Sequence, residues 1–429
     1  MLESIQNVLN VPEFRKRAVF TLIMFIIFRL GVHIPVPGVD AAAIEGLFNS
    51  GNLFGLLDLF SGGALSKFSV LAMSITPYIN ASIIMQLLTA VVPTFEQWSK
   101  DNQDGRDKIQ KVTRYGTVLL GFIQAFAMSY ALKVNNALID NSWTTVLMVA
   151  VILTAGTCFL MWLGDQITAG GIGNGISLII FAGIVARFPN GVNTLYQYVQ
   201  AGTINIFQAA LFALIALFMI VIVVEVTQGQ RRVNVQYAKR VVGRKMYGGH
   251  STHIPLKVNQ AGVIPIIFAS SLLTLPGIIA QFNTPQGGAA PPEWVNWVNT
   301  YLTRGDHPLY IVLYFLLILG FTYFYVAVTF DPVEVADNMK KYGGFIPGVR
   351  AGKPTERYLS YVLTRITLPG SLYLAVVSMI PLVALVLFNA NQNFPFGGAS
   401  LLIVVGVGLD TLKQVSAQLQ QRNYEGLLR

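Results

Sequence analysis

Ten apolar stretches, each long enough to cross a lipid bilayer, constrain the fold of this chain more than any other feature. A membrane-spanning helix needs about 20 apolar residues at 1.5 Å rise each. Only 11% of the side chains are charged, against roughly 25% in an average soluble domain. We therefore expect an all-α, polytopic membrane protein with spans near residues 18–36, 70–92, 115–134, 143–163, 172–188, 206–226, 261–282, 308–330, 366–388 and 398–415.

The 29 lysines and arginines indicate how these spans are oriented. If the N-terminus is cytoplasmic, nearly all of them fall in cytoplasmic segments; the exceptions are Arg29, Lys67, Lys133, Arg187 and Arg304. Cytoplasmic loops of membrane proteins carry such an excess of basic residues. This distribution predicts that both termini are cytoplasmic, and it accounts for most of the net charge of +9.

Five spans fall in residues 1–205 and five in residues 206–429. Because five is odd, the two halves enter the membrane from opposite sides, so an internal repeat between them must be inverted. Two pairs of segments align in this sense: Pro77–Ile83 with Pro265–Ser271, and Gly175–Gly183 with Gly398–Gly406. Such repeats place a substrate path between the halves, near the middle of the membrane.

The aligned segments carry isoleucines at matched positions. They are Ile79, Ile180, Ile267 and Ile403, and Ile83 and Ile176 lie one helical turn from the first two on the same helix faces. Ordinary packing is one interpretation of any single isoleucine in a span. A ring of branched alkyl groups without hydrogen-bonding atoms, flanked by serines and glycines, would instead form a constriction that excludes water and ions.

Residues 54–92 join an apolar span to a preceding segment that lipid cannot accommodate. Asp58, Lys67 and the Gly62-Gly63 pair interrupt the first part of this stretch. Irregular backbone persists at membrane depth only when it is buried in protein or lines a water-filled cavity. We therefore expect the rest of the chain to form the wall of a cavity that holds this segment.

Other function classes find less support in the residues. Ion-coupled carriers hold ionisable groups at the midplane, whereas Asp165, Glu225 and Asp410 lie near the ends of their spans. A small-molecule secondary transporter with inverted repeats remains the alternative, and an intramembrane protease using Asp165 and Asp410 is a distant one. Residues 348–354 lack the spacing and the Ser or Thr of a phosphate-binding loop. We expect no enzymatic activity, cofactor or metal, and a partner would supply any energy.

Two cytoplasmic loops, residues 228–260 and 331–365, are longer than a connection requires. The first alternates Val or Tyr with basic residues, which predicts a β-hairpin. One interpretation is that both loops set the topology and contact lipid headgroups. Projecting loops rich in Arg and Tyr also suit docking to RNA phosphates or to an acidic protein surface.

Several long segments resemble the SecY/Sec61-alpha family of protein-conducting channels. They include LFSGGALSKFSVLAMSITPYINASIIMQLL, GIGNGISLIIFAGIV and GGFIPGVRAGKPTERYL. The resemblance covers essentially the whole chain. It implies two inverted five-helix halves around an hourglass pore, a plug helix at about residues 56–69, and a lateral gate between spans 2/3 and 7/8. Such a channel translocates unfolded secretory polypeptides and releases membrane helices laterally into the bilayer.

The resemblance also implies roles for individual residues. The pore ring comprises Ile79, Ile83, Ile176, Ile180, Ile267 and Ile403, and the plug includes Leu56, Asp58, Phe60, Gly62, Gly63, Leu65 and Lys67. Polar positions expected at the lateral gate are Asn80, Gln86, Gln124, Asn259, Ser270 and Ser271. Basic positions expected to dock partners are Arg231, Arg232, Lys239, Arg240, Arg244, Lys245, Arg350, Lys353 and Arg357.

The partners that the resemblance implies are the SecE and SecG subunits, the SecA ATPase, the ribosome and polypeptides that bear signal sequences. Anionic lipids are a further expected contact of the basic loops. The expected location is the bacterial cytoplasmic (inner) membrane, crossed many times.

Overall fold

The computed structural model describes the chain except residues 1–11, 41–43, 45–60, 102, 135, 203–204, 238–239, 243–244, 248–250, 283–290, 304–306, 388–397 and 428–429. Each of the ten predicted spans overlaps a helix. They are α2 (Pro12–Gly31), α5 (Thr76–Val91), α7 (Gln103–Val134), α8 (Trp143–Gly170), α9 (Gly175–Val185), α11 (Ile206–Gln228), α12 (Ile264–Phe282), α14 (Pro308–Thr329), α16 (Lys353–Leu387) and α17 (Gly398–Leu427).

Length and composition identify seven of the described helical segments as able to span a membrane. The number becomes eight if α5 and α6 (Pro93–Lys100), which meet at a bend of 100°, count as one broken span. α12 contributes a shorter apolar helix, Ile264–Gly277. The expected class, a helical membrane protein with many spans, is confirmed.

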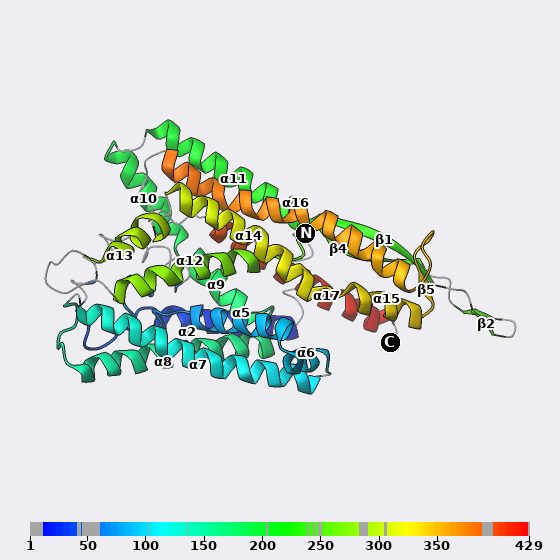
Figure 1. Cartoon of the computed structure of the whole chain (residues 1–429), viewed down its shortest axis with the longest axis horizontal. Helices are drawn as coiled ribbons and strands as arrows, with labels where there is room; N and C mark the ends of the chain where they lie inside the picture. The colour runs from blue at the N-terminus through cyan, green and yellow to red at the C-terminus, as the bar shows by residue number, and fades with distance from the viewer. Residues whose placement is uncertain are drawn as a thin grey trace.

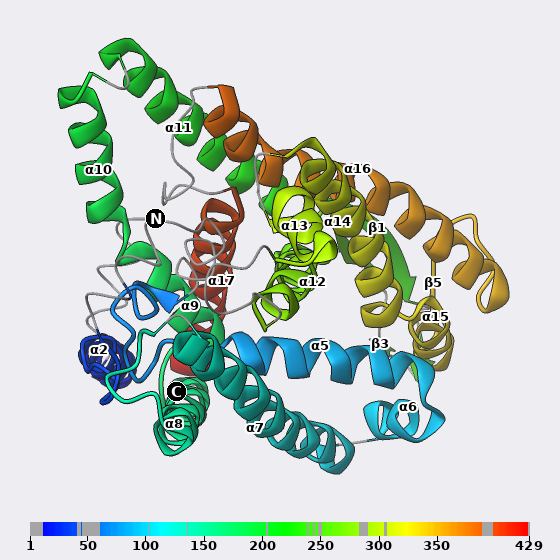
Figure 2. The same cartoon turned by 60° about the vertical axis from the view of Figure 1, so that its left-hand side comes forward.

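The spanning helices form two groups (Figure 1). In one group α7 packs against α5 and α8, and in the other α14 packs against α12 and α16. The groups meet where α9 contacts α17 and where α12 contacts α5 and α7. Helices from both halves of the chain therefore converge at the centre of the molecule (Figure 2).

The two ends of the bundle carry different structures (Figure 1). At one end lie α10 (Phe188–Gln200) and α13 (Glu293–Val298), and a π-helical turn, η1 (Asn299–Thr303), follows α13. At the other end lie α15 (Pro332–Lys341) and all the strands of the described chain. The longer predicted loops therefore project from a single end.

The predicted β-hairpin within residues 228–260 is confirmed. β1 (Gln230–Tyr237) pairs antiparallel with β4 (Ser251–Lys257), and β2 (Arg240–Val242) and β3 (Lys245–Tyr247) form the tip. β1 also pairs with β5 (Gly344–Phe345), which belongs to the second loop, so the sheet order is β4-β1-β5. The two projecting loops are one structural unit.

This unit has its own apolar core. Val233 and Val235 of β1 are buried while their neighbours Arg232 and Asn234 are exposed, because successive side chains of a strand face opposite sides. Both valines pack with residues from β4, α15, the segment after β5 and α16, namely Leu256, Met339, Ile346, Leu359 and Val362. Burial of these side chains fixes the position of the sheet on the end of α16.

Two boundaries differ from the sequence prediction. The second span starts at Thr76 and not near residue 70, because residues 62–75 form consecutive turns, a few of them with left-handed backbone. The second loop is largely helical, since α15 and the first turns of α16 occupy most of residues 332–365. At 1.5 Å per residue, the 35 residues of α16 measure roughly 52 Å, which exceeds the thickness of the hydrocarbon core, about 30 Å.

Candidate pore and docking surface

The isoleucines predicted to form a ring gather in one apolar cluster where α5, α9, α12 and α17 converge. Ile180 of α9 and Ile403 of α17 are buried members of this cluster. Ile79, Ile176 and Ile267 are partly buried and pack against it. The cluster thus joins side chains from both halves of the chain, as an apolar constriction requires.

Ile83 is the one ring candidate that is not part of this cluster. It lies on α5 one turn beyond Ile79 and is half-buried. Sequence reasoning also missed several members of the same cluster, among them Phe28, Val32, Leu71, Ile75 and Val407. Only the folded chain brings these residues together, because they come from α2 and the turn after it, from the turns before α5, and from α17.

The segment expected to plug the pore is described from Ser61 onward, and we call residues 61–75 the plug segment. Leu56, Asp58 and Phe60 lie outside the described residues. Residues 62–68 form turns and not the helix that the resemblance implies, and Ser69 forms an isolated β-bridge with Pro35. Ala64, Leu65 and Phe68 are buried, whereas Lys67 is exposed.

The plug segment contacts the wall of the bundle at several points. The guanidinium of Arg29 on α2 donates a hydrogen bond from Nη1 to the carbonyl oxygen of Gly62 at 3.1 Å. Val70 N donates to Ile34 O at 2.9 Å, and Val36 N donates to Phe68 O at 3.1 Å. These bonds satisfy backbone groups that no helix pairs at this depth, where unpaired polar groups are costly.

Gly62 and Gly63 have left-handed backbone, with φ of +68° and +88°, which favours glycine. Their surroundings differ. A Cβ on Gly62 would lie 2.8 Å from the Cα of Gly183 on α9, whereas a Cβ on Gly63 would meet only Ser66 Oγ at 3.9 Å. Gly62 is therefore the point at which the plug segment touches α9 backbone to backbone.

The polar residues expected at the lateral gate lie on the helices that meet across the two groups. Asn80 and Gln86 belong to α5, Gln124 to α7, and Ser270 and Ser271 to α12. Ser270 Oγ donates to Ile267 O at 2.9 Å within its own helix. Asn259, just before α12, is buried, and its side-chain oxygen has no hydrogen-bond partner among the described residues.

The candidate docking residues lie on the projecting unit, with their side chains only partly described. Arg231 and Arg232 are exposed on β1, and Lys353 and Arg357 are exposed on the first turns of α16. In the β2–β3 hairpin, Arg240 lies opposite Tyr247 and Lys245 lies opposite Val242. Lys239 and Arg244 lie outside the described residues.

Arg350 follows a tight turn formed by Ile346, Pro347, Gly348 and Val349. Val349 N donates to Ile346 O at 2.9 Å, and Gly348 between them has φ of +82°. Pro followed by Gly at the two central positions is typical of a type II turn. Thr355 Oγ1 then donates to the carbonyl oxygen of Arg350 at 2.9 Å. These bonds hold the backbone of Arg350 while its side chain stays exposed.

Asp165, one of the two carboxylates considered for a protease, is engaged in another contact. Its Oδ2 lies 2.8 Å from Nη2 of Arg114 on α7. This ion pair links α7 and α8. The partner of Asp165 is thus an arginine, whereas an aspartyl dyad requires two carboxylates that share a proton.

The chain is similar to known proteins in sequence and in fold. The family model described as SecY matches residues 69–412. A protein translocase subunit SecY from Streptomyces galbus is 52% identical over 100% of both chains.

Three solved structures share the fold. "The structure of a protein conducting channel" matches with a TM-score of 0.68 at 18% identity, covering 94% of this chain and 92% of that one. A structure described as "The plug domain of the SecY protein stablizes the closed state of the translocation channel and maintains a membrane seal" matches with a TM-score of 0.65 at 19% identity; the coverage is again 94% and 92%. Sec61 in the canine ribosome–channel complex matches with a TM-score of 0.64 at 17% identity, also with coverage of 94% and 92%.

Because the SecY family model covers residues 69–412 and the Streptomyces relative is 52% identical over the whole of both chains, the chain belongs to the SecY family.

Proposed function

We propose that this chain is the channel subunit of a protein translocase: a passive, gated pore that passes unfolded polypeptides across the cytoplasmic membrane. The observation that carries the proposal is the 52% identity, over the full length of both chains, with a protein translocase subunit. The isoleucine cluster at the junction of both halves supports it, because a donor-free constriction lets chemically varied side chains pass without fixed hydrogen bonds.

In this proposal the plug segment and the isoleucines close the pore together. The plug segment lies against the same apolar cluster, since Ala64, Leu71 and Ile75 are members of it. A signal sequence would open the lateral gate by entering where α12 meets α5 and α7. The polar side chains of Gln124, Asn259 and the α12 serines would line this exit, through which membrane helices reach lipid.

Energy would come from partners that bind the projecting unit, with both termini of the chain in the cytoplasm. The candidates are the SecA ATPase and the ribosome, with SecE and SecG as companion subunits. The canine relative in a ribosome–channel complex supports docking of a ribosome. Exposed arginines on a sheet that is fixed to α16 suit phosphates or an acidic protein surface.

Cross-linking of a translocating chain tests the proposed path. With a stalled secretory polypeptide in the pore, we expect a single cysteine at Ile180 to form cross-links, in a background in which Cys158, the only native cysteine, is alanine. A cysteine at Leu217, which is exposed on α11, should form none. Equal cross-linking at both positions, or cross-linking at Leu217 alone, would place the polypeptide outside the isoleucine cluster.

Charge reversal at Arg350 tests docking. We expect Arg350→Glu to lower ATPase-driven transport by at least about tenfold, since like charges at an interface commonly cost several kcal/mol and about 1.4 kcal/mol already corresponds to tenfold. Transport of a secretory precursor into reconstituted vesicles, with the motor ATPase added, measures the effect. Lys341→Glu makes the same charge change on the exposed end of α15 and should transport normally. If both variants transport alike, Arg350 has no special part in docking.

A further inference from the structure

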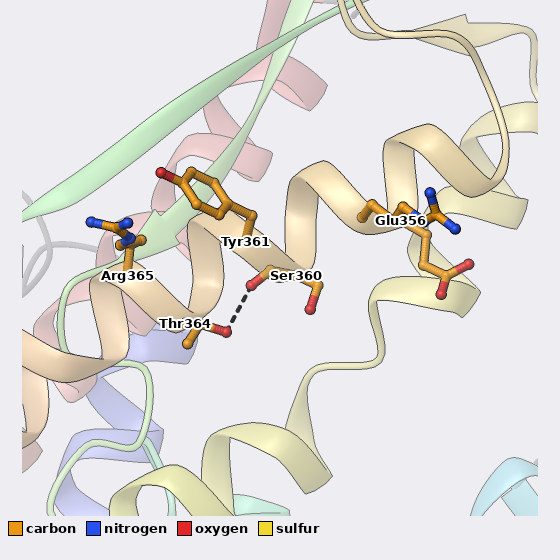
Figure 3. A pocket seen from close by; sticks show the side chains of 6 residues that line it. Glu356, Ser360, Tyr361, Thr364 and Arg365 are labelled. Carbon is orange, nitrogen blue, oxygen red and sulfur yellow. Dashed lines mark hydrogen bonds between the residues drawn. The ribbon is translucent and has the colours of Figure 1, made fainter.

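Many threonine hydroxyl groups in the described helices bond only within their own helix. Thr154 of α8 donates from Oγ1 to the carbonyl oxygen of Ala150 at 2.7 Å. Thr364 of α16 makes the same contact with the carbonyl oxygen of Ser360 at 2.9 Å (Figure 3). Such bonds pair the hydroxyl with a carbonyl one turn earlier and join no two parts of the chain.

Thr21 on α2 is different, because its hydroxyl bridges two segments. Its Oγ1 donates to the carbonyl oxygen of Arg17 within α2 at 2.9 Å, and it also accepts from the backbone amide of Ile172 at 3.2 Å. Thr21 and Ile172 are 151 positions apart. Ile172 belongs to residues 171–174, which we call the α8–α9 connection. The hydroxyl thus pairs an amide that lies outside both helices, as buried backbone requires.

The α8–α9 connection fits closely around this hydroxyl. A Cβ on Gly171 would lie 2.6 Å from Thr21 Oγ1 and 2.7 Å from the carbonyl oxygen of Ile167, so a side chain there would push the connection away from α2. At the other end, Gly175 N donates to Thr168 Oγ1 at 2.9 Å. Thr168 is exposed, so water can replace its hydroxyl, whereas Thr21 is only 7% exposed. The bond to Thr21 is therefore the harder one to replace.

The α8–α9 connection leads directly into the helix that carries two of the ring isoleucines. Ile176 comes four residues after Ile172, and Ile180 comes eight residues after it. Because α9 has only 11 residues, the place where it begins decides where both side chains lie. α2 also reaches the apolar cluster itself, since Phe28 is a buried member of it. α2 thus has one polar contact with the connection and one apolar contact with the cluster.

We propose that Thr21 is a positioning residue for the isoleucine constriction. Its hydroxyl holds the α8–α9 connection against α2, and the connection sets the depth and rotation of α9, so that Ile176 and Ile180 pack with Ile403 of the other half. Without the hydroxyl, the amide of Ile172 needs water as its partner, and the connection must move away from α2 to reach it. This inference rests on the proposed function, because it assumes that the isoleucines seal a pore.

Ion leak through the reconstituted full chain tests the inference. Valine keeps the shape of threonine and removes the hydroxyl. We expect Thr21→Val to raise the resting leak roughly tenfold, since a buried donor left without a partner commonly shifts an equilibrium by about that factor. Thr21→Ser keeps the hydroxyl and should leak no more than the unchanged chain. Thr154→Val is the matched control, because it removes a buried hydroxyl that bonds only within α8; it should also leave the leak low.

Amide hydrogen exchange reports on the bond itself. In Thr21→Val the amide of Ile172 should exchange at least about tenfold faster, because it loses its hydroxyl partner, and in Thr154→Val its rate should not change. Gly171→Ala perturbs the same contact from the other side, since its Cβ would meet Thr21 Oγ1. This variant should raise both the leak and the exchange rate, and it decides the matter if Thr21→Val does not fold.

Four results would overturn the inference. The first is a normal leak in Thr21→Val. The second is an equally raised leak in Thr21→Ser, which would assign the effect to packing. The third is an equally raised leak in Thr154→Val, which would assign it to general loosening of the helices. The fourth is a raised leak in Thr21→Val with unchanged exchange at Ile172, because the bond would then not be the cause.

Two further measurements separate this inference from the proposed function. Serine in place of Ile79, Ile176 and Ile267 weakens the constriction directly. A leak in that variant but not in Thr21→Val overturns the inference and leaves the proposed seal in place. Failure of the unchanged chain, supplied with a motor ATPase, to transport a secretory precursor would count against the proposed function alone.

Discussion

Serine in place of Ile79, Ile176 and Ile267 should make the resting channel leak ions. These three residues come from both halves of the chain and pack, partly buried, against the central apolar cluster. Each serine removes alkyl surface and adds a hydroxyl that holds water, so the constriction would hydrate more readily. If hydration becomes easier by only 1.4 kcal/mol, the leak rises about tenfold. Ion flux through the reconstituted chain, without motor or substrate, measures this change.

Two control variants separate the constriction from general damage to the protein. Leucine at the same three positions keeps the apolar volume and should retain a low leak, because volume-conserving swaps are tolerated best. Serine at Leu214, Leu217 and Val221 makes the same number of changes at exposed positions of α11, and this variant should also retain a low ion leak. A leak equal to that of the unchanged chain in the triple ring variant would exclude these isoleucines from the seal.

Local patterns in the sequence predict much of this fold. Continuous apolar runs identify the spans because a bilayer demands about 20 such residues. Alternation of valines with polar residues identifies β1, because side chains of a strand alternate between faces. The first turns of α16 are different. Lys353, Arg357 and Arg365 give them the composition of a loop, and their helix is stabilised by packing of Leu359 and Val362 on the sheet.

Features built from distant residues could not be predicted in the same way. The pairing of β5 with β1 joins residues about a hundred positions apart. The sequence of neither strand indicates which strand it pairs with. The turns of the plug segment depend on Arg29 and Gly183, which lie on separate helices. The Gly62-Gly63 pair predicts irregular backbone, but it does not indicate which of the two glycines contacts the backbone of another helix.

Alanine at Gly62 and alanine at Gly63 should therefore have different consequences, although both glycines have left-handed backbone. Each substitution carries a backbone cost of roughly 1–2 kcal/mol. Only at Gly62 would the new Cβ also lie 2.8 Å from the Cα of Gly183, which two backbones can relieve only by moving apart. We expect Gly62→Ala to displace the plug segment from α9 and to lengthen the hydrogen bond from Arg29.

A buried position within the plug segment reports this displacement. Leu65 is 2% exposed, so a cysteine placed there, with Cys158 replaced by alanine, should react slowly with a polar maleimide. In Gly62→Ala the reaction should be at least about tenfold faster, because a clash with backbone adds several kcal/mol of strain that only opening relieves. In Gly63→Ala a Cβ would meet only Ser66 Oγ, at the ordinary contact distance of 3.9 Å. Only the cost of the left-handed backbone then applies, so the reaction should accelerate less than in Gly62→Ala.

Equal reaction rates in the two alanine variants would mean that the Gly62–Gly183 contact does not hold the plug segment in place. Ion leak provides an independent measurement on the same proteins. If the plug segment and the isoleucine cluster seal the pore in series, displacing the plug segment alone should raise the leak only in part, because the isoleucine cluster still limits the flux. The ion leak of a variant that combines Gly62→Ala with the three serines should then exceed the leak of either variant alone, because each intact seal limits the flux that loss of the other allows.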